Sequence, residues 1–257
     1  KMAEDAPSRR PSLAERLSKC PRRAELADGA PSEEKDVPSC RVRVCLCVCG
    51  SVAAVKMPAL VDSLLQRGYA VDIVLTAAAR HFTNSVAYKG GMGADALDTI
   101  RASAAGRDHV ELWLDEDEWD DYGEVGTDPV LHVELAQRND VLLFAPLDAH
   151  TLAKAALGLA DNLAACVLRA WPYDLTDDAP DAAQACKPVL VCPSMNTVMW
   201  RQRITAQHLA TLTQRGVRVV EPMVKMLACG DVGKGAMAEV SVIVDAVDSE
   251  VARSRHS

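Results

Sequence analysis

Aromatic residues are scarce in this chain of 257 residues, where Phe, Tyr and Trp together make up 4% of the sequence. No run of about 18 apolar residues occurs, so we expect no membrane-spanning helix. The first residues contain no apolar core of a signal peptide. The formal net charge of −8 argues against a nucleic-acid partner. We therefore expect neither a membrane nor a nucleic acid among the partners of this protein.

A disulfide framework is also missing. The chain has nine cysteines, an odd number, and Cys45, Cys47 and Cys49 alternate within one apolar run. Side chains two residues apart on a strand point to the same face, so these three sulfurs are expected on one face of a buried strand. This pattern favours core packing over a metal site, and we expect reduced thiols in a cytoplasmic compartment.

Two segments lack the regular patterns of the remainder. Residues 1–40 hold five of the thirteen prolines and show no apolar periodicity beyond one helical turn. We expect a poorly ordered N-terminal extension there, followed by one domain over residues 41–257. The acidic run at 115–121, DEDEWDD, is more typical of a solvated loop than of a metal site.

Apolar runs alternate with helical periods from residue 41 onward. This alternation predicts an α/β fold, a single Rossmann-like or flavodoxin-like domain with a mainly parallel sheet flanked by helices. Pro58 predicts a kink or break in the first helix, because proline disrupts a helix interior. Strands are expected at 41–49, 69–76, 110–114, 140–145, 189–192 and 217–220, and helices at 51–67, 128–138, 204–215 and 241–253. Two further helical segments are expected, one with Asp148 as its N-cap and one that begins near Thr197.

The turn after the first strand, at Gly50, Ser51 and Val52, leads directly into a helix. This geometry presents backbone N–H groups to a phosphate. Only one glycine is present, so the turn lacks the dinucleotide fingerprint G-x-G-x-x-G and suits a mononucleotide better. Thr76, at the end of the second strand, places a hydroxyl at the same edge of the sheet.

Two polar residues each have an ordinary structural explanation beside a functional one. Asn196 follows the strand at 189–192 and could point its amide into a crevice beyond the sheet, or simply cap the next helix. His132 lies in the first turn of the helix at 128–138, where a surface histidine is the ordinary reading. Sequence spacing alone does not decide either case.

Four separated motifs change these readings. They are GSVAAVK at 50–56, PVLH at 129–132, PSMNTVMW at 193–200 and LACGDVGKGAMAE at 227–239. In order and spacing they resemble the motifs of the flavin-dependent cysteine decarboxylases, over roughly residues 44–244. Against that family, the segments 88–129 and 172–186 contain insertions.

The resemblance implies flavin mononucleotide (FMN) as cofactor. Residues 221–239 contain three glycines and no clean apolar period, which predicts a loop. The resemblance implies that this loop is a substrate clamp, with Gly230, Gly233 and Gly235 as its hinges. His150 stands where the family has Asn, which puts a direct amide contact to the flavin in doubt. The flavin contacts implied by the resemblance are Gly50, Ser51, Val52, Thr76, Asp148, Ala149, His150, Thr151 and Ser194.

The resemblance is greatest to the branch that decarboxylates 4′-phosphopantothenoylcysteine in coenzyme A biosynthesis. It implies that the substrate thiol is oxidised, that CO₂ leaves and that the resulting enethiol is reduced to 4′-phosphopantetheine. His132 would act as base, Asn196 would hold the carboxylate and Cys229 would donate a proton. The implied substrate neighbours are Asn196, Met199, Met226, Leu227 and Ala228.

The resemblance further implies a homotrimer, or a heterotrimer with a paralogous chain. Two alternatives stay open: a regulatory halotolerance-type subunit that binds a protein phosphatase, and a flavin prenyltransferase on the same fold. The intact set of His132, Asn196 and Cys229 favours catalysis over regulation. The cysteine in the clamp argues against the prenyltransferase.

Overall fold

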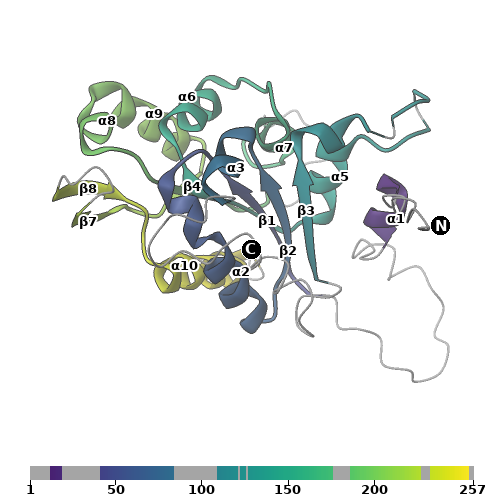
Figure 1. Cartoon of the computed structure of the whole chain (residues 1–257), viewed down its shortest axis with the longest axis horizontal. Helices are drawn as coiled ribbons and strands as arrows, with labels where there is room; N and C mark the ends of the chain where they lie inside the picture. Colours follow the sequence, from purple (N-terminus) through teal and green to yellow (C-terminus); the bar gives the residue numbers. More distant parts are fainter. Residues whose placement is uncertain are drawn as a thin grey trace, which may run out of the picture.

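A six-stranded parallel sheet forms the centre of the molecule (Figure 1). The computed structural model describes residues 12–18, 41–83, 109–120, 122–125, 127–175, 186–226 and 232–254. The strand order is β3-β2-β1-β4-β5-β6, and all neighbouring strands pair in parallel. This confirms the predicted α/β fold. The strands are β1 (Arg43–Val48), β2 (Ala70–Leu75), β3 (Val110–Leu114), β4 (Val141–Leu147), β5 (Val189–Pro193) and β6 (Arg218–Val219).

Helices cover both faces of the sheet (Figure 1). The helices α2 (Met57–Gln66) and α10 (Val240–Ser254) pack on one face. The opposite face is covered by α5 (Leu131–Arg138), α6 (Ala149–Leu157), α7 (Leu163–Ala170) and α9 (Arg203–Gln214). Two short helices, α3 (Ala77–Thr83) and α8 (Thr197–Arg201), follow β2 and β5.

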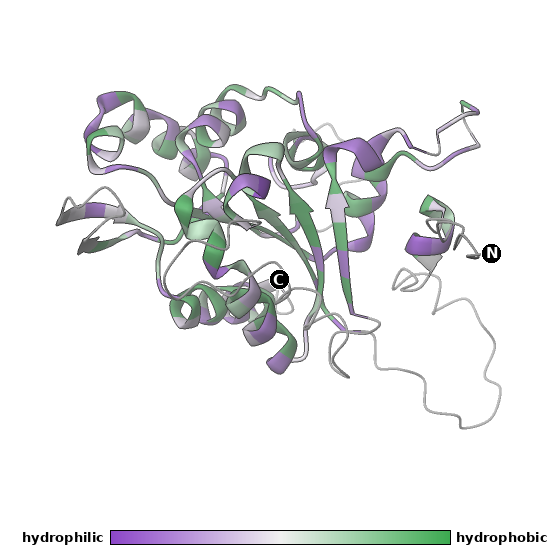
Figure 2. Ribbon diagram, in the orientation of Figure 1, coloured by the Kyte–Doolittle hydropathy of each residue, from purple (hydrophilic) through white to green (hydrophobic). Residues whose placement is uncertain are grey.

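The alternation along β1 divides the core into two clusters. Val44, Leu46 and Val48 pack with α2 and α10, whereas Cys45, Cys47 and Cys49 pack with the helices of the other face. All six side chains are fully buried. The cysteines therefore share one face, as their spacing predicts. Figure 2 shows the same pattern, with hydrophobic strands inside and polar residues on the outer sides of the helices.

Proline and capping residues set the helix boundaries near the site. A short 3₁₀ helix, η1 (Val52–Lys56), precedes α2, so the chain breaks regular helix just before Pro58 as predicted. Helix α5 is shorter than predicted and begins at Leu131, because Val130 is still extended. Pro129 therefore lies before the helix and not at its first position.

The segment 221–239 is not wholly a loop. β7 (Met223–Met226) and β8 (Val232–Ala236) form an antiparallel hairpin separate from the main sheet. The prediction of a loop is wrong over these strands. Glycine-rich composition hides them, since Gly has low strand propensity.

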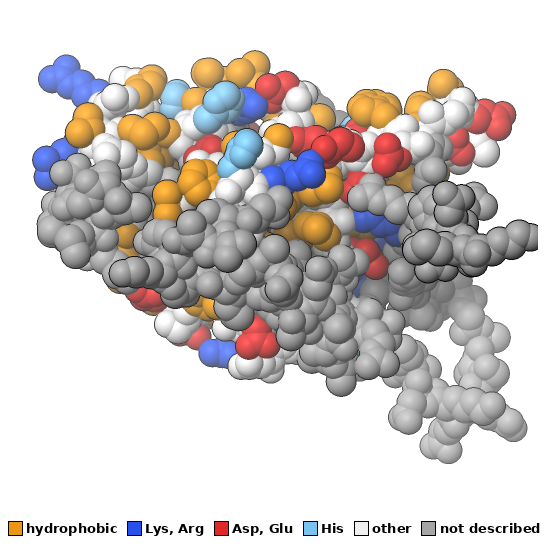
Figure 3. All heavy atoms as spheres, viewed as in Figure 1, with side chains coloured by type: hydrophobic (Ala, Val, Ile, Leu, Met, Phe, Trp, Pro, Cys, Tyr) orange, Lys and Arg blue, Asp and Glu red, His pale blue; other side chains and the backbone are white. Residues whose placement is uncertain are grey.

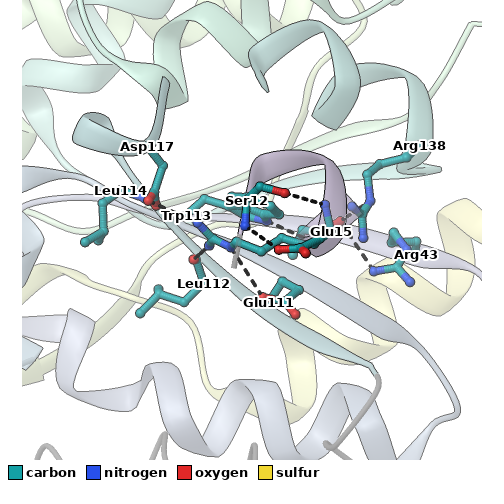
Figure 4. Close-up of polar contacts among 11 residues, drawn as sticks. Ser12, Glu15, Arg43, Glu111, Leu112, Trp113, Leu114, Asp117 and Arg138 are labelled. Atoms are coloured by element: carbon teal, nitrogen blue, oxygen red, sulfur yellow. Dashed lines mark hydrogen bonds and ion pairs between the residues drawn. The ribbon is translucent and has the colours of Figure 1, made fainter. Parts of the chain in front are cut away.

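The predicted extension contains a helix that packs on the domain. α1 (Leu13–Ser18) buries Leu13 in the cluster that includes the three β1 cysteines. The Arg16 guanidinium lies 3.9 Å from the centre of the Trp113 ring and 3.0 Å from Asp117 Oδ1. Figure 4 shows Ser12 and Glu15 of this helix lying over the strand that carries Glu111 and Leu112.

The first four residues of the acidic run after β3 form a folded turn, and the prediction of a solvated loop is wrong for Asp117 and Glu118. Residues Asp115–Glu118 form a 3₁₀ helix, η2, in which Asp117 and Glu118 are buried. Acidic side chains are visible on the side of the molecule where β3 ends (Figure 3). Composition cannot distinguish such a turn from a solvated loop, because the distinction depends on partners far away in the chain.

Candidate functional site

The strand order reverses its direction between β1 and β4. The chain proceeds from β1 through β2 to β3 on one side, and from β4 through β5 to β6 on the other. Ligands of open α/β sheets bind at such a switch point, beyond the carboxyl ends of the strands. The predicted cofactor residues follow the carboxyl ends of β1, β2, β4 and β5, so the topology brings them to this one edge.

The turn after β1 is packed tightly. A Cβ atom on Gly50 would lie 2.6 Å from the Cβ of Ala78 and 3.1 Å from Asp148 Oδ2. Ser51 caps η1: its Oγ accepts a hydrogen bond from the N–H of Ala53 at 3.3 Å. The same hydroxyl donates to Ser194 Oγ at 3.0 Å, which joins the turns after β1 and β5. Predicted cofactor residues from two strands are thus in direct contact.

The turn after β4 has the predicted cap. Asp148 Oδ1 accepts a hydrogen bond from the N–H of Thr151 at 2.6 Å, at the start of α6. Thr151 is buried, Ala149 is half-buried and His150 is exposed. Burial, followed by the nearby Asp148 carboxylate, raises the pKa of Cys49 to about 12. Cys49 is therefore a neutral thiol of the core beneath this turn.

Thr76 closes the turn after β2. Its Oγ1 donates to the carbonyl of Val48 at 3.3 Å and accepts from the N–H of Ala79 at 3.2 Å. The hydroxyl is buried and already bonded on both sides within the chain. It holds the β1 and β2 turns together at the predicted cofactor edge.

Asn196 does cap the next helix, which is one of its two predicted roles. Its Oδ1 accepts a hydrogen bond from the N–H of Val198 at 2.7 Å, at the start of α8. This bond fixes the side chain just beyond the carboxyl end of β5. Met199, one turn further, is 42% exposed and available to a ligand.

The hairpin is attached to the turn that carries Asn196. The carbonyl of Gly235 accepts from the N–H of Met195 at 3.0 Å. A Cβ atom on Gly233 would lie 2.6 Å from Thr197 Oγ1, and one on Gly235 would lie 2.4 Å from the Met195 carbonyl oxygen. These two glycines permit close packing of the hairpin against the turn that carries Asn196. Cys229, with Leu227 and Ala228, lies outside the described residues, as does the side chain of Met226.

Two ion pairs hold the hairpin from either side. Lys56, at the end of η1, lies 3.2 Å from Glu239 Oε2 beyond β8. Lys234 on β8 lies 2.5 Å from Glu221 Oε2 and 5.2 Å from the centre of the Trp200 ring. The ammonium of Lys234 therefore has two partners within the chain.

His132 has a carboxylate partner that sequence reasoning missed. Its Nδ1 lies 2.6 Å from Oε1 of Glu118, in the η2 turn. Glu118 is buried, whereas the His132 side chain is 26% exposed. A carboxylate on one ring nitrogen fixes the tautomer and leaves the other nitrogen as an acceptor. The sequence gives no local signal for this pair, because its two residues lie fourteen positions apart on different elements.

His132 and Asn196 stand on different elements toward opposite ends of the sheet edge. α5 lies near β3 and α7, whereas α8 lies beyond β5 beside the hairpin (Figure 1). Within the described residues, no hydrogen bond joins the two side chains. A single chain therefore places the predicted base and the predicted carboxylate holder in separate surroundings.

Known proteins resemble this chain over most of its length. The model of the Flavoprotein family matches residues 32–252. The chain belongs to the Flavoprotein family. A phosphopantothenoylcysteine decarboxylase of Arabidopsis thaliana is 40% identical over 205 residues, which cover 80% of this chain and 83% of that protein. One of Mus musculus is 39% identical over 228 residues, covering 88% and 93%.

Solved structures agree with this family assignment. A mutant PPC decarboxylase complexed with pantothenoylaminoethenethiol has a TM-score of 0.65 and 38% identity, covering 81% of this chain and 97% of that chain. The FMN-binding protein AtHal3 has a TM-score of 0.63 and 39% identity, covering 81% and 96%. The predicted resemblance to flavin-dependent decarboxylases is confirmed. None of the described helices is both long and apolar enough to cross a membrane.

Proposed function

We propose that this protein is an FMN-dependent decarboxylase that converts 4′-phosphopantothenoylcysteine to 4′-phosphopantetheine. Two observations taken together support the proposal. Relatives about 40% identical over most of the chain are named phosphopantothenoylcysteine decarboxylases. The cofactor residues predicted from sequence also meet at the switch point of the sheet, where an α/β fold binds its ligand.

The residues at the switch point fit a bound flavin mononucleotide. Gly50 lets the turn after β1 pack closely against Ala78 and Asp148, which draws the turns after β1, β2 and β4 together. Ser51 and Ser194 supply hydroxyls, and the N–H groups at the start of η1 are suited to a phosphate. The chain offers one glycine here rather than a dinucleotide fingerprint, which favours the mononucleotide.

Bound flavin would supply a reversible two-electron acceptor, which lets the substrate thiol be oxidised and later restored. His132, held through Nδ1 by Glu118, would take up a proton at Nε2. Asn196, held by its cap to α8, would hydrogen-bond the substrate carboxylate without a full counter-charge that stabilises the ground state. Cys229 would return a proton to the enethiol carbon.

Two measurements test this assignment on the purified protein. The chromophore is released with acid and identified by mass, and the protein is then supplied with 4′-phosphopantothenoylcysteine. We expect flavin mononucleotide, CO₂ and 4′-phosphopantetheine. Recovery of flavin adenine dinucleotide would contradict the cofactor assignment, and absence of the pantetheine product with flavin present would contradict the reaction.

We also propose that the active assembly is a trimer, either of this chain alone or with a paralogue, and that one site takes residues from two subunits. The separation of α5 and α8 supports a shared site, since one chain does not bring His132 to Asn196. Val198 and Met199 on α8 and Val224 on β7 are exposed apolar side chains beside the hairpin. Exposed apolar side chains that gather in one region favour an interface.

Mixing two inactive variants tests the shared site. His132→Asn and Asn196→Ala are co-expressed, so that assemblies contain both chains. If each site draws on two subunits, about a quarter of the sites regain both native residues and activity returns to that extent. Activity that stays at the level of the separate variants would place both residues in one chain. Light scattering that gives an active monomer would also contradict the trimer.

A further inference from the structure

The η2 turn is built to hold its last residue in place. Asp115 Oδ1 accepts from the N–H of Leu163 at 3.0 Å, at the start of α7. Asp117 accepts from the N–H of Leu114 at 2.8 Å, and its other oxygen takes Arg16 of α1 at 3.0 Å. The turn is therefore bonded to three separate elements of the fold.

Among the described residues, the Glu118 side chain makes one polar contact from this fixed position. Its Oε1 meets Nδ1 of His132 at 2.6 Å. Its Oε2 is buried and has no hydrogen-bond partner among the described residues. A buried carboxylate without further partners is costly, so its retention is better explained by the histidine than by packing. Glu116, two positions earlier, instead forms an exposed pair with Arg80 at 2.6 Å.

We infer that Glu118 is the positioning residue of His132, and that it keeps the neutral imidazole protonated on Nδ1 so that Nε2 is free to accept a proton from the substrate. A carboxylate oxygen can only accept, so a neutral ring must donate to it from Nδ1. The same carboxylate stabilises the imidazolium that forms when Nε2 takes a proton. No bond to substrate is assigned to Glu118, which acts through His132. The inference deepens the proposed function and rests on it for the identity of the reaction.

The test reads the tautomer directly, separately from turnover. Imidazole nitrogens of ¹⁵N-labelled protein are recorded by NMR at a pH where the ring is neutral, and the His132 signals are assigned by their loss in His132→Asn. We expect the Nδ1–H tautomer in the native protein. In Glu118→Ala we expect the ring to shift toward Nε2–H. The kcat should fall by about 10²-fold, as for loss of a general base, with KM changed much less.

A matched control removes the neighbouring carboxylate. Glu116→Ala should leave both the tautomer and kcat unchanged, because its partner Arg80 is exposed and not part of the site. Native protein in the Nε2–H form would overturn the inference, even if Glu118→Ala failed to fold. So would a folded Glu118→Ala with an unchanged tautomer or an unchanged kcat. If native protein lacks the decarboxylase activity, the proposed function fails, while the tautomer still decides whether Glu118 orients His132.

Discussion

The backbone N–H of Met195 donates to the carbonyl of Gly235 at 3.0 Å, which fastens the base of the hairpin to the turn preceding Asn196. Gly235 has a φ of 149°, a conformation that side-chain-bearing residues rarely adopt. The predicted substrate clamp thus has an anchored base.

Gly235→Ala should break this attachment. The new Cβ would lie 2.4 Å from the Met195 carbonyl oxygen, and the backbone at this φ would be strained. We expect a loss of about 1–3 kcal/mol in the free energy of unfolding. Hydrogen exchange should become faster in β7, β8 and the turn at 194–196. Gly123→Ala is the matched control, since its Cβ would have ordinary contact at 3.7 Å. Equal exchange in the two variants would contradict the anchored base.

Arg16→Ala should release α1 from the domain. The Arg16 side chain is 15% exposed and pairs with the buried Asp117, and it also covers the Trp113 ring. We expect a loss of about 1–3 kcal/mol, because Asp117 then loses a buried partner. Arg80→Ala, which removes the exposed pair with Glu116, should cost less than about 1 kcal/mol. Denaturant unfolding of both variants checks the difference, and an equal cost would mean that α1 adds no stability.

Features that depend on residues close together in the chain could be predicted from the sequence, whereas features that depend on distant residues could not. Asp148 and Ser51 were assigned correctly as ends of elements because their bonds reach only two or three residues along the chain. The β1 cysteines were placed correctly because strand periodicity is local. Glu118 was missed because its partner lies in another element, and a run of acidic residues is compatible with many structures. The hairpin was missed because its glycines pack against the distant Thr197 and Met195.

The buried thiol of Cys49 makes stability depend on alkaline pH. Its pKa is raised to about 12 in the folded protein by burial and by Asp148, whereas the thiol of an unfolded chain has a pKa of about 8.5. Between these values unfolding releases a proton, so the free energy of unfolding falls as pH rises. From pH 8 to pH 10, titration of Cys49 lowers the free energy of unfolding by about 2 kcal/mol.

Cys49→Ala removes this pH-dependent contribution, whatever the substitution costs in packing. Its free energy of unfolding should therefore decrease by about 2 kcal/mol less than that of the native protein between pH 8 and pH 10. Denaturant titrations at both values measure the difference. Cys186→Ala is the control, because Cys186 is exposed. Parallel pH profiles for the Cys49 variant and the native protein would show that Cys49 titrates normally.

His132→Asn tests the predicted base. Asparagine preserves some hydrogen bonding but lacks the imidazole, so folding and flavin content should persist. Turnover should fall by at least about 10²-fold, the usual contribution of a general base. The matched comparison is His150→Asn, which restores the residue typical of the family at an exposed position and should remain active. Near-native turnover of His132→Asn would leave His132 as a surface residue of α5.

Cys229→Ser separates the two halves of the proposed reaction. If Cys229 donates the final proton, oxidation of the thiol and loss of CO₂ should still proceed in the variant. Serine is a much weaker acid than a thiol with a pKa of about 8.5, so the enethiol would form but would not be reduced efficiently.

The signature of this stall is specific. Under anaerobic conditions we expect CO₂ without normal product, a bleached flavin spectrum that does not recover, and a compound about two mass units lighter than 4′-phosphopantetheine, because reduction of the enethiol adds two hydrogens. Cys186→Ser, which changes an exposed cysteine outside the proposed site, should give the full yield of product. If Cys229→Ser also gives full yield at the native rate, Cys229 is not the proton donor, and another group must supply the proton.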